Sequence, residues 1–201
     1  MGHVVDFPTR APRGTLNNVD PVLQEKLPVL ETAGETTQYS FFSNQIDTIA
    51  HAPSIQQLKS SCSVFETILE TGIHSGLWWL HVASPPDEDI DILSRMLDIH
   101  PLTTEDIKMR ELREKFELFG PYYFVSLRAP QQPKIAAGVQ ASSVNVYAIV
   151  FQESVISFTY DNSQHPTHVW NRIKEHQSHL ALTSDWICYA LMYGSVMPLQ
   201  I

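Results

Sequence analysis

Two adjacent carboxylates, Glu105 and Asp106, are the residues whose chemistry best fits a ligand. Hard divalent cations such as Mg²⁺ prefer carboxylate oxygens and keep much of their water shell, so one or two carboxylates facing a cleft between subunits suffice for a weak regulatory site. A plainer interpretation is a helix start carrying acids, which the helix dipole stabilises by about 0.3–1 kcal/mol. The residue pattern alone favours this plainer interpretation.

Nine histidines in an acidic chain suggest zinc, but their spacing argues against it. His165 and His168 are three positions apart, as are His176 and His179, and neither pair forms an HExxH motif. No cysteine lies near either pair. We therefore expect exposed or helix-facing histidines. A hydrolase using this histidine-rich helix is a weak alternative that stoichiometric zinc would revive.

The motifs of common enzyme classes are missing from the sequence. There is no G-x-S-x-G nucleophile elbow, no GxxxxGK[ST] loop and no GxGxxG turn, and the eight glycines are scattered. We expect no enzymatic activity. Cys62 and Cys188 lie far apart with no CxxC spacing, which favours reduced, buried thiols.

Length and composition indicate one acidic domain. The chain has 201 residues, of which 43% are hydrophobic, and its formal net charge is −9, which argues against a nucleic-acid partner. We find no window of about 18 consecutive apolar residues that could span a bilayer. Residues 1–38, rich in Pro, Thr, Asn and Gly, are predicted to form a flexible tail, and residues 39–201 the domain.

Hydrophobic patterning predicts the elements that must position the two acids. Strands are expected over 39–43, 77–82, 122–128, 144–151 and 155–160, and helices after positions 54, 63, 86, 166 and 184. The strand at 77–82 shows no alternation, which suits burial on both faces. This order predicts an α/β domain with three layers, α/β/α, around a mixed sheet.

The acids themselves are expected at the start of a short helix. Pro101 disfavours a helical backbone at His100, so the chain should turn there. Thr103 or Thr104 can then cap a new helix with Glu105 and Asp106 in its first turn.

Several motifs in the right order resemble the cytosolic domain of CorA-superfamily magnesium transporters. Around the acids, the chain carries the family's features in sequence: Ile99–Leu102 (IHPL), Glu105–Ile107 (EDI), Arg113–Lys115 (REK) and the aromatic strand Tyr122–Val125. Upstream, Trp79–Val82 is similar to the family's strand that begins with Trp.

Downstream segments strengthen this resemblance. Asn145–Phe151 with Val155–Phe158 resembles a hairpin of the family, and Ser184–Ile187 resembles a helix start. Phe41–Ser43, Ile49–Pro53 and the Arg-Glu-Lys triplet are similar to the fungal Alr/Mnr2 branch. The resemblance covers about residues 39–191 and implies a CorA soluble-domain fold.

The resemblance also implies a function and a site. It implies a pentameric, channel-like transporter in which weakly bound regulatory Mg²⁺, held between neighbouring subunits, keeps the pore closed. Asp106 matches the acidic position of that site, with Glu105 beside it, and the partner carboxylate belongs to a long stalk helix of a neighbour. This interpretation places the chain on the cytosolic side of a plasma or vacuolar membrane.

The sequence departs from the family's pattern in two ways, which leave an alternative function open. The chain has no Gly-Met-Asn pore signature and no transmembrane pair, so we expect that it cannot conduct ions by itself. It could instead be a stand-alone interaction module that kept the fold and binds transporter subunits. That module would use its sheet edge or the helix at 166–180.

Overall fold

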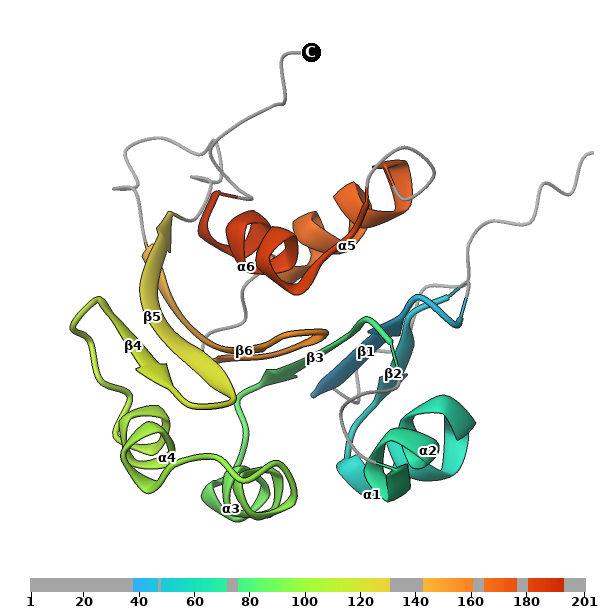
Figure 1. The fold of residues 1–201 in the computed structure, drawn as a ribbon, viewed down its shortest axis with the longest axis horizontal. Helices are drawn as coiled ribbons and strands as arrows, with labels where there is room; N and C mark the ends of the chain where they lie inside the picture. The colour runs from blue at the N-terminus through green and yellow to red at the C-terminus, as the bar shows by residue number, and fades with distance from the viewer. Residues whose placement is uncertain are drawn as a thin grey trace, which may run out of the picture. The chain divides into compact units, whose positions relative to one another are not determined.

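Seven strands form one mixed β-sheet in the computed structural model, which describes residues 38–46, 48–71, 76–130, 143–160, 165–176 and 181–193 (Figure 1). The strand order is β2-β1-β3-β7-β6-β5-β4. β3 and β7 pair in parallel, and all other neighbours are antiparallel. Apart from Gln38, the predicted tail lies outside the described residues. The strands are β1 Tyr39–Ser43, β2 Ala50–Ala52, β3 Trp78–Ala83, β4 Lys115–Phe119, β5 Tyr122–Pro130, β6 Ser143–Phe151 and β7 Ser154–Thr159.

Helices cover both faces of this sheet, which confirms the predicted three-layer α/β/α arrangement (Figure 1). Helices α1 to α4 pack on one face of the sheet, and their buried side chains form a first apolar cluster with that face. Helices α5 and α6 pack on the other face in a second cluster. The helices are α1 Ile55–Ser61, α2 Ser63–Thr71, α3 Asp87–Met96, α4 Pro101–Lys108, α5 His165–His176 and α6 Ser184–Tyr193.

Strand β3 is buried on both faces, as its sequence predicts. Trp78 and Leu80 belong to the first apolar cluster, whereas Trp79 between them belongs to the second. Neighbouring strand residues point to opposite faces, so each of these large side chains fills a different layer. The predicted hairpin is also confirmed, because β6 and β7 pair antiparallel with Val150 opposite Val155.

Cysteine burial agrees with the prediction of reduced thiols. Cys62 and Cys188 are buried and free, and they lie in different apolar clusters on opposite faces of the sheet. Within the described residues, no helix is long and apolar enough to cross a membrane.

Two predicted helix caps have different outcomes. Ser54 caps α1 as predicted, since its Oγ accepts a hydrogen bond from the Gln57 amide at 3.2 Å. The predicted cap Ser184 is wrong. Thr183 Oγ1 accepts from the Trp186 amide at 3.1 Å, and Ser184 Oγ instead donates to the Gln152 carbonyl at 2.9 Å.

Strand β4, which the sequence patterning did not predict, forms one edge of the sheet. It pairs with β5 across the Gly120-Pro121 turn, with Phe119 opposite Tyr122. Phe116 and Leu118 lie on the face opposite α4 and are 59% and 78% exposed, because none of the helices in the described residues covers them. The alternate residues, Lys115 and Glu117, lie on the α4 side.

Candidate metal site

Helix α4, which carries both predicted site residues, begins earlier than the sequence analysis predicts. Pro101 is its first residue and His100 is its N-cap, with Nδ1 accepting from the Leu102 amide at 3.2 Å. Proline suits the first helical position because its fixed φ is helical and no N–H is needed there. The predicted cap at Thr103 or Thr104 is therefore wrong.

The early start moves both acids out of the first turn of α4, where the analysis placed them. No acidic residue lies in that turn. Glu105 and Asp106 lie in the following turn, where the positive end of the helix dipole no longer stabilises them appreciably. The plainer interpretation of the two carboxylates, a helix start decorated with acids, loses its physical basis.

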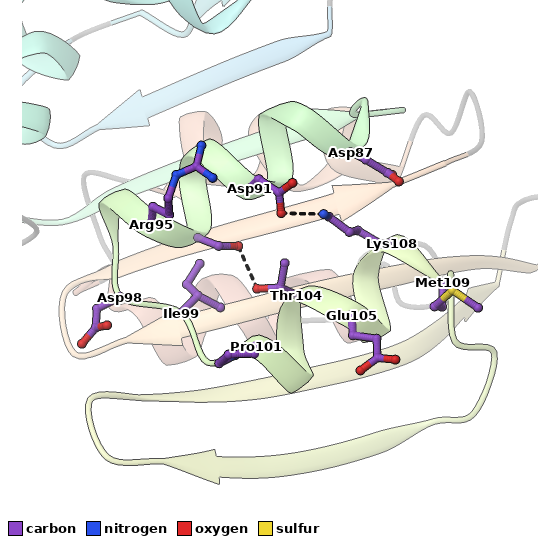
Figure 2. A pocket seen from close by; sticks show the side chains of 11 residues that line it. Asp87, Asp91, Arg95, Asp98, Ile99, Pro101, Thr104, Glu105, Lys108 and Met109 are labelled. Atoms are coloured by element: carbon purple, nitrogen blue, oxygen red, sulfur yellow. Dashed lines mark hydrogen bonds and ion pairs between the residues drawn. The ribbon is translucent and has the colours of Figure 1, made fainter.

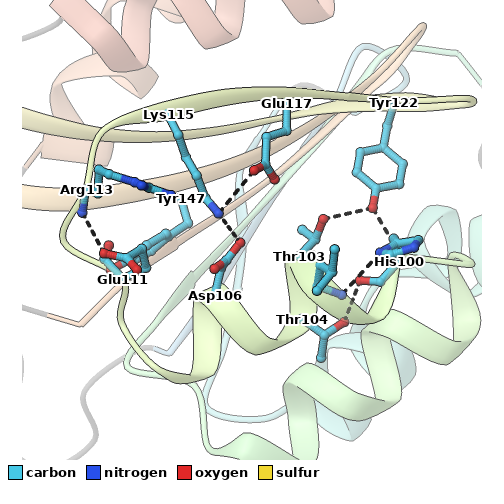
Figure 3. A network of polar contacts seen from close by, with 11 residues as sticks. His100, Thr103, Thr104, Asp106, Glu111, Arg113, Lys115, Glu117, Tyr122 and Tyr147 are labelled. Carbon is cyan, nitrogen blue, oxygen red and sulfur yellow. Dashed lines mark hydrogen bonds and ion pairs between the residues drawn. The ribbon is translucent and has the colours of Figure 1, made fainter.

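The Asp106 side chain points toward the sheet and binds a lysine (Figure 3). Lys115 Nζ on β4 donates to Asp106 Oδ2, and it also lies 3.4 Å from Glu117 Oε1. The Lys115 and Asp106 side chains are only 13% and 20% exposed. Asp106 is therefore a mostly covered carboxylate whose surroundings already suit a positive charge.

Glu105 points in a different direction: it belongs to the lining of the groove between α3 and α4, and its carboxylate is turned away from α3 (Figure 2). This groove has a volume of about 720 Å³, and its charged lining comprises Asp87, Asp91, Asp98, Glu105, Arg95 and Lys108. Consecutive helical residues are separated by about 100° around the axis, so Glu105 and Asp106 do not face one point. In the described part of the chain, no group of three or more His, Cys, Asp or Glu side chains is arranged to hold a metal.

Three tyrosines from the sheet fix α4 and the segment that follows it. At the helix start, the Tyr122 hydroxyl accepts from the His100 amide at 2.9 Å and bonds Thr103 Oγ1 at 3.0 Å (Figure 3). At the other end, the Tyr160 hydroxyl donates to the Ile107 carbonyl at 2.7 Å. The Tyr147 hydroxyl donates to the Glu111 carbonyl at 3.0 Å. We name Tyr122, Tyr147 and Tyr160 the tyrosine clamp.

The sequence analysis did not identify the tyrosine clamp. Its members lie in or beside apolar strands. In such a strand, the sequence does not distinguish a tyrosine whose hydroxyl binds a helix from any other buried aromatic residue. Only the pairing of β5, β6 and β7 brings the three hydroxyl groups under α4.

We expect replacement of Tyr122 by Phe to loosen the start of α4. The His100 amide would lose its acceptor in a partly buried position, which costs about 1–3 kcal/mol of unfolding free energy. Hydrogen exchange should then accelerate at the α4 amides more than in β6. Tyr193→Phe, at a residue 46% exposed, is the control. Equal exchange rates in the Tyr122 variant and the wild type would contradict a positioning role.

Three histidines of the described region, His51, His81 and His100, have structural partners within the domain. His81 is 5% exposed, and its Nδ1 lies 2.9 Å from Ser157 Oγ. His100 caps α4. The predicted pairs cannot be compared in full, because the side chains of His165 and His176, and all of His179, lie outside the described residues.

The fold is shared with proteins of known structure. The architecture is similar to the complete structure of the CorA magnesium transporter from Methanocaldococcus jannaschii, with a TM-score of 0.50 and 13% identity. The match covers 80% of this chain and 44% of that chain. The family model described as CorA-like Mg²⁺ transporter protein matches residues 74–197. The chain therefore belongs to the CorA-like Mg²⁺ transporter family.

Fungal relatives confirm the predicted resemblance to the Alr/Mnr2 branch. The chain is 35% identical over 156 residues to magnesium transporter ALR2 of Saccharomyces cerevisiae, covering 78% of this chain and 18% of that protein. It is 52% identical over 52 residues to manganese resistance protein MNR2 of the same yeast, covering 26% and 5%. The chain spans 18–24% of the length of the curated relatives that match most of it.

Proposed function

We propose that this chain is a Mg²⁺-sensing regulatory domain of a magnesium transporter, in which a divalent cation bound at Asp106 between subunits biases the pore closed. The environment of the Asp106 carboxylate carries the proposal. This carboxylate lies on a helix that the tyrosine clamp fixes, it is partly accessible, and it is already paired with a cation. Glu105 offers a second, exposed carboxylate on the adjoining surface of α4.

Weak binding suits a sensor of this kind. Mg²⁺ binds through one or two carboxylates and keeps several waters, so a site completed by a neighbouring subunit needs few ligands from each chain. A Kd of about 1 mM corresponds to only about −4 kcal/mol. Shifting a two-state pore from almost fully open to almost fully closed takes about 5.5 kcal/mol, which is about 1 kcal/mol per site in a pentamer.

The assembly and the location are part of the proposal. The domain would form a homopentamer on the cytosolic side of a plasma or vacuolar membrane, attached through membrane-spanning parts of the transporter. Its net charge of −9 disfavours a nucleic-acid partner and favours cations. Loss of Mg²⁺ would leave carboxylates of neighbouring subunits facing each other, and the ring would loosen.

Replacing Asp106 by Asn tests the proposal. With a Kd of about 1 mM, 10 mM Mg²⁺ should stabilise the wild type by about 1.4 kcal/mol, or about 3–6 °C in Tm. Asp106→Asn keeps the side-chain shape but removes the charge, so this Mg²⁺-dependent increase should disappear. The measurement is thermal unfolding of each chain with and without Mg²⁺.

Glu88→Gln is the matched control, since it removes one exposed negative charge from the first turn of α3, the helix that precedes α4. It should respond to Mg²⁺ as the wild type does. A full Mg²⁺ response in Asp106→Asn would remove Asp106 from the model. The alternative is a module that binds transporter subunits, and the exposed Phe116 and Leu118 favour it. The same experiment separates the two functions, because such a module needs no Asp106-dependent stabilisation by Mg²⁺.

A further inference from the structure

Lys115 lies between two carboxylates at the edge of the sheet (Figure 3). Its ammonium binds Asp106, lies 3.4 Å from Glu117, and sits 5.7 Å from the centre of the Phe124 ring. The side chain is 13% exposed, and Asp106 is 20% exposed. The ammonium therefore occupies Asp106 Oδ2, a carboxylate oxygen that another cation could otherwise bind.

The electrostatic surroundings keep Lys115 charged. Burial by itself lowers the pKa of Lys115, but the hydrogen bond from Lys115 to Asp106, the charge of Asp106 and the nearby Glu117 outweigh burial and raise it above its ordinary value. Lys115 is consequently a permanent cation at any physiological pH. It cannot leave Asp106 by losing a proton.

We propose that Lys115 is an affinity-determining residue, a tethered competitor that a divalent cation must displace from Asp106. This inference rests on the proposed function of Asp106. Binding is then an exchange of one cation for another, in which the metal takes the carboxylate oxygen and the ammonium swings away. Because the competitor is covalently attached, its local concentration does not change, and it lowers the apparent affinity for Mg²⁺ by a constant factor.

Glu117 gives the displaced ammonium a second partner. Lys115 and Glu117 are two positions apart on β4, so their side chains leave the strand on the same face. At 3.4 Å, Glu117 Oε1 is already within ion-pair distance of Nζ. The ammonium can thus stay paired after it leaves Asp106, which makes the exchange with Mg²⁺ reversible.

Replacing Lys115 by Met tests the inference, because Met keeps an apolar stem beside Phe124 and removes the charge. The probe is Mn²⁺, whose free concentration is read by electron paramagnetic resonance, followed by displacement with Mg²⁺. We expect Lys115→Met to bind about tenfold more tightly than the wild type, or about 1.4 kcal/mol. Glu117→Gln removes the second partner of the ammonium and should weaken binding, and the effect should shrink in the Lys115→Met background.

Two controls make the outcomes distinguishable. Lys59→Met removes one positive charge from a lysine that is 46% exposed on α1, and it should leave binding at the wild-type level. Asp106→Asn should lose binding, alone and combined with Lys115→Met. If Asp106→Asn loses binding but Lys115→Met binds like the wild type, the competitor model fails and the proposed function stands.

The remaining outcomes also decide between the competitor model and the proposed function. If the wild type binds the ions measurably and Asp106→Asn binds them equally well, the proposed function fails, and the inference fails with it. If neither the wild type nor Lys115→Met binds the ions, the competitor model is overturned. Binding gained only in Lys115→Met, and lost again with Asp106→Asn, supports the model even where the wild type is too weak to measure.

Discussion

Replacing Trp79 by Ala is expected to lower the free energy of unfolding by about 3–5 kcal/mol. Trp79 is fully buried on β3, the strand that joins the antiparallel edge of the sheet to its parallel partner β7. Its indole stacks on Trp170 of α5 with ring centroids 3.6 Å apart, and its Nε1 donates to Ser157 Oγ at 2.8 Å. Truncation would open a cavity in the second apolar cluster and loosen the attachment of α5.

Urea denaturation of paired variants measures this loss. Trp79→Phe keeps an aromatic ring and should cost clearly less than Trp79→Ala. Trp186→Ala on α6 is the second comparison, because Trp186 is only partly buried at the margin of the same cluster. Since domains of this kind are stable by only about 5–15 kcal/mol in total, Trp79→Ala should unfold at markedly lower urea. Equal midpoints for the two Trp79 variants would show that the stack contributes little.

The sheet is the part of the fold that sequence patterning predicted best. The run from Trp78 to Val82 is too apolar for a one-sided strand, and the structure places it between two helical layers. The β6–β7 hairpin follows from two apolar runs separated by a polar turn. Such patterns reflect burial, and burial is set by the layers of the fold.

Strand β4 was not predicted, although its charged and apolar residues alternate as in a half-buried strand. The alternation would in any case have assigned its faces wrongly, since Phe116 and Leu118 are exposed and the charged Lys115 and Glu117 face α4. The usual rule, apolar side chains inward, therefore predicts the wrong face. Edge strands frequently depart from this rule because half of their surroundings are solvent.

The candidate site was predicted as a pair of residues, not as a geometry. Sequence analysis selected Glu105 and Asp106 from their chemistry and from a family motif. It could not show that Asp106 binds Lys115, nine positions further on, since that contact depends on β4 folding back beside α4. It also placed the start of α4 too late, because it treated Pro101 as a break rather than as the first helical residue.

Between pH 10 and pH 12 the domain is expected to lose stability, because its buried tyrosines ionise at higher pH in the folded domain than in the unfolded chain. The pKa of Tyr147 is raised to about 12, mainly by burial and to a lesser extent by the nearby Tyr160 and Glu111. Burial also raises the pKa of Tyr160 to about 12, although Arg110 opposes the increase. In the unfolded chain, both hydroxyls ionise near pH 10.

The sign and size of this loss follow from proton binding. Above pH 10 the unfolded chain holds fewer protons than the folded one, so the free energy of unfolding falls as pH rises toward 12. Tyr147 alone contributes at most about 1.1 kcal/mol per pH unit, near pH 11, and about 2 kcal/mol between pH 10 and pH 12. The less buried Tyr160 adds a smaller amount.

Two signals followed during alkaline titration test this expectation, tyrosinate absorbance and circular dichroism. Part of the tyrosinate signal should appear only as the fold is lost, and Tyr147→Phe should show a shallower loss of stability with pH than the wild type. Complete tyrosine ionisation near pH 10 with the fold intact would contradict buried hydroxyls.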